Sequence, residues 1–268
     1  MIYDKLPIVF LSTLVSEKNG STNSQIAAYI LNHLEEVQNL GIKEIAKECN
    51  VAVSSISRFC KEVGLRDFAE LKELLLSTDL SFEDHSHATS KQARLHDYSH
   101  KVRESIIMVE KSIDMDAVID LCKDINEYQK VAIFGLLKAG AVAFNLQGDL
   151  LMLNKQVYTN ISYSQQIQYI VAADEDDLII IFSYTGAYFD YQDLRALKKR
   201  LTAPKIWMIS SDDREYPECI DRTILFKSLQ DQNSHPYQLQ FIAGLIAQEY
   251  SRSVSYTHLR AHETEADL

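Results

Sequence analysis

Apolar residues recur at helical spacing through the first 78 residues of this chain. Hydrophobic side chains return every three or four residues, which places them on one face of a helix. The clearest such stretches are 25–37, 42–48 and 53–63. A tight break at Cys49-Asn50-Val51 separates the last two stretches, and Gly64 is expected to end the third. The pattern predicts an all-α N-terminal domain over residues 1–78.

The spacing of apolar residues changes after residue 129. Short apolar runs rich in β-branched and aromatic residues alternate with helical stretches, which is typical of parallel βαβ units covered on both faces. The runs expected as strands are 130–134, 157–161, 177–184, 205–210 and 222–227. Two helices are expected before them and a closing helix over 235–250. The C-terminal domain, residues 96–252, is therefore predicted to be a five-stranded parallel αβα sandwich of the flavodoxin-like kind.

Residues 79–95 are polar and lack a clear period, so they are predicted to link the two domains. Histidines fall in or beside this segment, and His96 and His100 would share one face of a helix. A metal site is one interpretation of these histidines. A solvated linker is favoured, since no cysteine or acidic residue completes a ligand spacing, and no metal or cofactor is expected. The polar segment 253–268 fits neither domain and is expected to be a disordered or non-native tail.

Composition and charge narrow the class of protein. Hydrophobic residues make up 46% of the 268 residues, which is enough for a buried core. No apolar run approaches the length of a membrane span, no secretory signal is evident, and the four cysteines are scattered, so a cytoplasmic protein is expected. The net charge of −11 argues against indiscriminate nucleic-acid binding.

The segment 42–60 carries the strongest indication of function. Two short helices joined by a tight turn are the layout of a helix-turn-helix, in which one helix braces another that lies in the major groove of DNA. An αα-hairpin of an ordinary helical bundle would show the same period, and the pattern alone leaves that alternative open. The expected DNA-binding residues are outward-facing hydroxyls and cations: Lys43, Ser54, Ser55, Ser57, Arg58 and Lys61.

Two resemblances sharpen this interpretation. The sequence SSISRFCKEVG followed by LRDFAELKELL resembles the N-terminal domain of the RpiR/MurR family of bacterial transcriptional regulators. Residues 100–252 resemble a sugar isomerase (SIS) domain, the phosphosugar-binding module of that family. The resemblance implies a homodimer or higher homo-oligomer that binds an operator in double-stranded DNA and responds to a small anionic ligand such as a sugar phosphate. Residues 1–78 hold 8 Lys and Arg against 10 Asp and Glu, so DNA affinity is expected to depend on dimerisation.

Two strand ends carry the expected effector site, because ligands of open parallel sheets bind beyond the carboxyl ends of the strands. In the SIS domain the first loop usually reads Gly-x-Gly-x-Ser and the second Ser-x-Ser-Gly-x-Thr. Here Leu137 stands at the second Gly, Ala139 at the first loop's Ser and Tyr188 at the final Thr, so about half of the expected hydroxyls are missing. The expected effector-binding residues are Gly135, Lys138, Ala139, Ser183, Tyr184, Thr185, Gly186 and Tyr188.

Three functions are compatible with these features. A ligand-responsive transcriptional regulator of carbohydrate metabolism, without enzymatic activity, ranks first. A SIS-type aldose–ketose isomerase ranks second and would need a base near the sugar, for which Glu218 and His235 are candidates. An interaction module that binds no small ligand ranks third.

Overall fold

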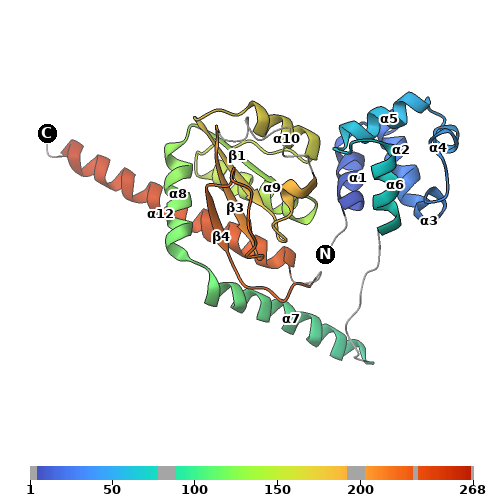
Figure 1. The fold of residues 1–268 in the computed structure, drawn as a ribbon. Helices are drawn as coiled ribbons and strands as arrows, with labels where there is room; N and C mark the ends of the chain where they lie inside the picture. The colour runs from blue at the N-terminus through green and yellow to red at the C-terminus, as the bar shows by residue number, and fades with distance from the viewer. Residues whose placement is uncertain (1–4, 78–88, 192–202, 232–234, 267–268) are drawn as a thin grey trace.

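The computed structural model describes residues 5–77, 89–191, 203–231 and 235–266. An all-α N-terminal part, here called the head, is followed by an α/β part, here called the module (Figure 1). This arrangement confirms the predicted fold class. Among the described residues, no helix is both long and apolar enough to cross a membrane.

The head consists of six helices whose lengths follow the spacing of apolar residues. They are α1 (Lys5–Ser16), α2 (Thr22–Asn32), α3 (Leu34–Val37), α4 (Ile42–Glu48), α5 (Val53–Glu62) and α6 (Phe68–Ser77). The helix expected over 25–37 is divided at His33, where φ is −132° and ψ is 35°. Phe10, Ile45 and Phe59 are fully buried, and the rings of Phe10 and Phe59 lie 5.4 Å apart. These contacts tie α1 to α5.

The module is built around a sheet of parallel strands in the order β1-β2-β3-β4. The strands are β1 (Lys130–Gly135), β2 (Asp177–Phe182), β3 (Lys205–Ser210) and β4 (Arg222–Leu225). The helices of the module are α7 (Lys91–Ser112), α8 (Met115–Glu127), α9 (Lys138–Met152), α10 (Tyr163–Ala172) and α12 (His235–Ala266), with a 3-10 turn at Tyr188–Tyr191.

The prediction of five strands was wrong. The segment 157–161 forms only an isolated bridge, in which Tyr158 pairs with Ala132 beside β1. The Tyr158 N–H donates to the Val131 carbonyl and the Ile133 N–H to the Tyr158 carbonyl, both at 2.8 Å. The carbonyl of Ile133 instead accepts a hydrogen bond from the Thr159 hydroxyl at 2.6 Å. Since a side chain takes the acceptor that a longer ladder would use, pairing stops after one residue.

Each face of the sheet contributes to a separate apolar core. Ile133, Ile180 and Trp207 point to the face covered by α8, α9 and α12. Phe134, Ile181 and Met208 point to the opposite face, where they join α10 and the buried residues of the head in one cluster. The central strand β2 is buried at every residue, as expected for a parallel sheet covered on both faces, and the head completes the cover of one face.

Two boundaries differ from those predicted. Most of the expected linker, 79–95, lies outside the described residues, but α7 already begins at Lys91. The closing helix α12 continues to Ala266, so the segment expected to be a disordered tail is largely helical and projects beyond the module (Figure 1). That segment contains no Gly or Pro, so extending the helix costs little free energy.

Candidate functional site

The helices α4 and α5 are joined by a turn whose backbone suits its sequence. Asn50 adopts a left-handed conformation with φ of 52°, which asparagine tolerates better than most residues. The Val51 N–H donates to the Ala46 carbonyl at 2.9 Å and holds the turn closed. After α5, Gly64 has a φ of 86° and the Leu65 N–H donates to the Cys60 carbonyl at 2.8 Å. Gly64 therefore ends the helix as predicted.

The outer face of α5 is exposed at the surface of the head. Its inner residues, Ile56, Phe59 and Cys60, are fully buried. The predicted contact residues lie at the surface: Lys43, Ser54, Arg58 and Lys61 are exposed, and Ser55 and Ser57 are half-buried. This exposure is what a recognition helix requires, and an αα-hairpin of an ordinary helical bundle would also expose one face of α5.

One acidic residue shares the face with these cations. Arg58 Nε lies 3.6 Å from Glu62 Oε1, and Glu62 Oε2 accepts a hydrogen bond from Asn23 Nδ2 at 2.7 Å. The Arg58 side chain is 65% exposed, so this ion pair is weak and leaves the guanidinium able to move. Sequence spacing predicted the cations of this face but not the position of Glu62 among them.

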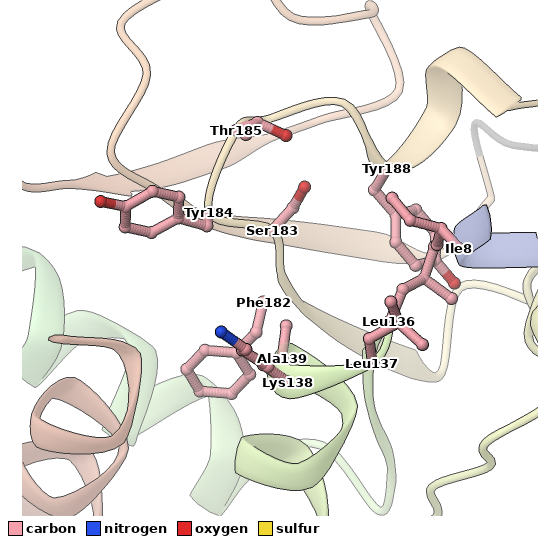
Figure 2. A pocket seen from close by; sticks show the side chains of 10 residues that line it. All are labelled: Ile8, Leu136, Leu137, Lys138, Ala139, Phe182, Ser183, Tyr184, Thr185 and Tyr188. Atoms are coloured by element: carbon pink, nitrogen blue, oxygen red, sulfur yellow. The ribbon is translucent and has the colours of Figure 1, made fainter. Parts of the chain in front are cut away.

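The two predicted effector loops meet at the carboxyl edge of the sheet and enclose a cavity of about 60 Å³ (Figure 2). Six of the eight predicted residues line it: Lys138, Ala139, Ser183, Tyr184, Thr185 and Tyr188. Leu136, Leu137 and Phe182 add apolar surface, and Ile8 of α1 reaches the cavity from the head. The sequence indicated the loops, whereas the contribution of Ile8 depends on how the head packs.

Gly135 and Gly186 are absent from the lining and act through the backbone. A Cβ at Gly135 would lie 2.6 Å from the carbonyl carbon of Ala139, so only glycine allows β1 and α9 to approach this closely. Gly186 has a φ of 67°, and a Cβ there would lie 3.0 Å from the Tyr216 ring. Both residues shape the loops but do not line the cavity.

Leu137 occupies a backbone position that glycine normally takes. Its φ is 51° and its ψ is −114°, a conformation that L-amino acids rarely adopt. This is the position at which SIS domains usually carry the second Gly of the first loop. Leu137 thus has a backbone conformation typical of glycine, and its side chain adds apolar bulk to the cavity.

The four polar side chains of the second loop play different roles. Figure 2 shows the Ser183 hydroxyl pointing into the space between Thr185 and Tyr188, while the Tyr184 ring points away from it. Tyr184 is bonded through its hydroxyl to Ser228, and burial raises the pKa of this hydroxyl to about 12. Tyr188 is 1% exposed, and burial raises the pKa of its hydroxyl well above the ordinary value. Ser183 and Thr185 therefore present the hydroxyls that a ligand could use, and the tyrosines serve mainly as packing.

Gln166 connects the two loops, and no motif in the sequence pointed to it. Its side chain is fully buried on α10. Gln166 Nε2 donates to the Gly135 carbonyl at 2.9 Å, and Gln166 Oε1 accepts from the Tyr188 hydroxyl at 2.6 Å. A glutamine on an otherwise apolar helix face is the only sequence signal that could have indicated this role.

Of the two candidate bases for an isomerase, only Glu218 has a described side chain, and it is not at the cavity. Glu218 is exposed and does not belong to the cavity lining. His235 is the first residue of α12, and its side chain lies outside the described part of the chain. The rings of His96 and His100 stack on α7 with centroids 6.1 Å apart, and no cluster of three potential metal ligands occurs among the described residues.

The helices α4 and α5 form a helix-turn-helix in which α5 is exposed, and a parallel α/β module follows the head. This arrangement defines a two-domain helix-turn-helix protein. Residues 11–82 match the family described as "Helix-turn-helix domain, rpiR family". The head is therefore similar to the helix-turn-helix domains of the rpiR family.

Relatives of this chain are named as transcriptional regulators. An uncharacterized HTH-type transcriptional regulator in the aarA 3' region of Providencia stuartii is 23% identical over 186 residues, which are 66% of this chain and 64% of that protein. The chain thus spans just under two thirds of that relative. HexR of Escherichia coli strain K12 is 22% identical over 200 residues, which are 73% of this chain and 69% of HexR.

A solved structure resembles both parts of the chain together. The Vibrio vulnificus NanR protein, complexed with ManNAc-6P, matches 98% of this chain and 96% of its own, with a TM-score of 0.51 and 14% identity. At this identity the likeness shows a shared fold, comprising both the head and the module.

Proposed function

We propose that this chain is a DNA-binding transcriptional regulator of carbohydrate metabolism, controlled by a sugar phosphate that binds at the carboxyl edge of the module's sheet. The observation that carries the proposal is the exposed face of α5, braced by α4 in a helix-turn-helix similar to those of the rpiR family. The regulators named among its relatives support the same conclusion.

In this proposal α5 enters the major groove. Ser54 and Ser55, at the start of the helix, approach base edges, while Arg58, Lys61 and Lys43 neutralise phosphates. The head is not basic overall, so one copy makes few favourable contacts with DNA. Two copies related by a two-fold axis present two such helices to successive major grooves, which doubles the number of phosphate contacts. The proposed regulator therefore binds a roughly palindromic operator as a dimer or larger homo-oligomer.

The proposed effector site is the cavity between the two loops. Ser183 and Thr185 offer hydroxyls to a phosphate, and Lys138 lies at the first residue of α9. NanR, whose fold the chain shares, is complexed with ManNAc-6P, which supports a sugar phosphate as the ligand class. A regulator is favoured over an isomerase because Glu218 lies away from the cavity and the relatives are named as regulators.

Gel-shift binding to the DNA upstream of the chain's own gene tests the DNA-binding half of the proposal. Arg58→Ala is expected to weaken binding and to reduce the slope of log K against log salt concentration by about 0.9 per copy, since one phosphate contact is lost. Arg103→Ala is the matched control: it removes the same charge from an exposed position on α7. Equal binding by the two variants would contradict the assignment of α5 as the recognition helix.

A thermal-shift titration with ManNAc-6P tests the effector half. The sugar phosphate is expected to raise the midpoint temperature of unfolding of the wild-type chain. It should raise that of Ser183→Ala less, because this variant lacks the hydroxyl that would hydrogen-bond to the charged phosphate. An identical shift in both proteins would place the ligand elsewhere.

A further inference from the structure

The head contacts the module at the effector cavity itself. Ile8, on α1, is 6% exposed and lines the cavity beside Leu136, Leu137 and Tyr188 (Figure 2). Every other lining residue in the described part of the chain belongs to the module. The DNA-binding part of the protein therefore supplies one wall of the site proposed for the effector.

Ser12, one turn further along α1, fastens the head to the module. This serine is 3% exposed, and its hydroxyl donates to the Ile161 carbonyl at 2.9 Å and accepts from the Tyr163 N–H at 3.1 Å. Tyr163 is the first residue of α10, a position at which backbone N–H groups are satisfied from outside the helix. The serine of the head thus caps a helix of the module across the interface.

A chain of hydrogen bonds continues from this contact to both effector loops. The Tyr163 hydroxyl donates to the Tyr188 carbonyl at 2.9 Å, and the Tyr188 hydroxyl donates to Gln166 Oε1 at 2.6 Å. Gln166 Nε2 then donates to the Gly135 carbonyl at 2.9 Å. All three side chains are buried, so the network has no access to water that would replace a lost bond.

The cavity is small when α1 is docked beside it. About 60 Å³ holds a few water molecules, whereas pockets for small ligands usually offer roughly 300 Å³ or more. The remaining wall is formed by the loops after β1 and β2, by the last residue of β2 and by the start of α9, all of which belong to the module. Ile8 belongs to a separate helical part, so it is the wall that a rigid-body shift of the head can remove.

We propose that docking of α1 and binding of the effector are alternative states of this protein. The inference rests on the proposed function, because it concerns the same site. A sugar phosphate enters when Ile8 withdraws and the Ser12 contacts break, and the head is then released from the module. Two exclusive states of this kind are thermodynamically linked, so whatever weakens docking strengthens ligand binding by the same factor.

Calorimetric titration of the full chain with ManNAc-6P tests this linkage. Ser12→Ala removes both contacts of the hydroxyl, and Ile8→Ala opens the wall; each is expected to tighten binding about tenfold relative to wild type. Val15→Ala is the control, since Val15 lies on the same helix but is 64% exposed. The affinity of this variant for ManNAc-6P should equal that of wild type. Equal affinity in all four proteins, or binding in none of them, would overturn the proposal.

Hydrogen exchange at the Tyr163 amide provides a second measurement that does not depend on the size of the affinity change. This amide is expected to be protected in the free wild-type chain and to exchange faster in Ser12→Ala or after saturation with ManNAc-6P. Unchanged protection in the saturated chain would also overturn the proposal. Loss of the proposed function has a different signature: operator DNA would not be bound by wild type, whatever the exchange at Tyr163.

Discussion

Leu137 provides a test of backbone strain. Alanine usually makes a protein more stable than glycine at the same position, and at position 137 we expect the opposite order. Its φ of 51° and ψ of −114° are accessible to glycine but strained for any residue with a Cβ. We therefore compare Leu137→Gly with Leu137→Ala. Both variants lose the leucine side chain, so the difference between them isolates the backbone conformation.

The magnitude follows from two opposing effects on the free energy of unfolding. A residue with a Cβ in such a conformation costs roughly 1–3 kcal/mol, which alanine retains and glycine relieves. Glycine loses more conformational entropy on folding than alanine, by roughly 0.5–1 kcal/mol. The strain exceeds the entropy cost, so Leu137→Gly is expected to be more stable than Leu137→Ala by about 1 kcal/mol.

Urea unfolding followed by tryptophan fluorescence measures this difference in the module alone. The chain has a single tryptophan, Trp207, which is 1% exposed in β3. Gly148→Ala is the matched comparison: Gly148 lies inside α9 and nothing approaches a Cβ built there within 4 Å, so alanine should be the more stable residue by roughly 0.5–1 kcal/mol. If alanine is at least as stable as glycine at position 137 as well, the loop is not strained and the reasoning fails.

Three further predictions concern other parts of the chain. Gly135→Ala should destabilise the module by roughly 2–3 kcal/mol in the same urea assay, because its Cβ would lie 2.7 Å from the Ala139 carbonyl oxygen; unaltered stability would contradict the close approach of β1 and α9. Lys72→Met should destabilise the head by about 2 kcal/mol, because Lys72 Nζ donates to the Val37 and Leu40 carbonyls at 3.0 and 2.9 Å. Unfolding followed by circular dichroism measures this loss, and Lys47→Met, at an exposed position, should leave the stability of the head almost unchanged. Burial raises the pKa of Cys60 from 9.0 to about 12, so the thiol of the folded protein should resist Ellman's reagent at pH 8. The free energy of unfolding should fall as the pH rises from about 9 towards 12, because the thiol ionises first in the unfolded chain. Rapid labelling of the folded protein would refute the burial of Cys60.

Local patterns were sufficient to predict most of the elements. Apolar spacing placed α4 and α5 and the turn at Asn50 between them, because one helical face must be buried and a left-handed residue is needed to reverse the chain. The same reasoning placed the loops after β1 and β2, and six of the eight predicted effector residues line one cavity. The fifth strand could not be excluded from the sequence, because Thr159 bonds to a backbone carbonyl that a ladder would otherwise use.

The sequence by itself determined the two domains, the polar face of α5 and the departures of the effector loops from the family pattern, since these depend on residue type and spacing along the chain. Only the tertiary structure decided that Ile8 lines the cavity, that Ser12 caps α10 and that Gln166 joins the two loops. These contacts join residues far apart in the sequence. The local spacing of apolar residues does not predict which surfaces meet when the head packs on the module.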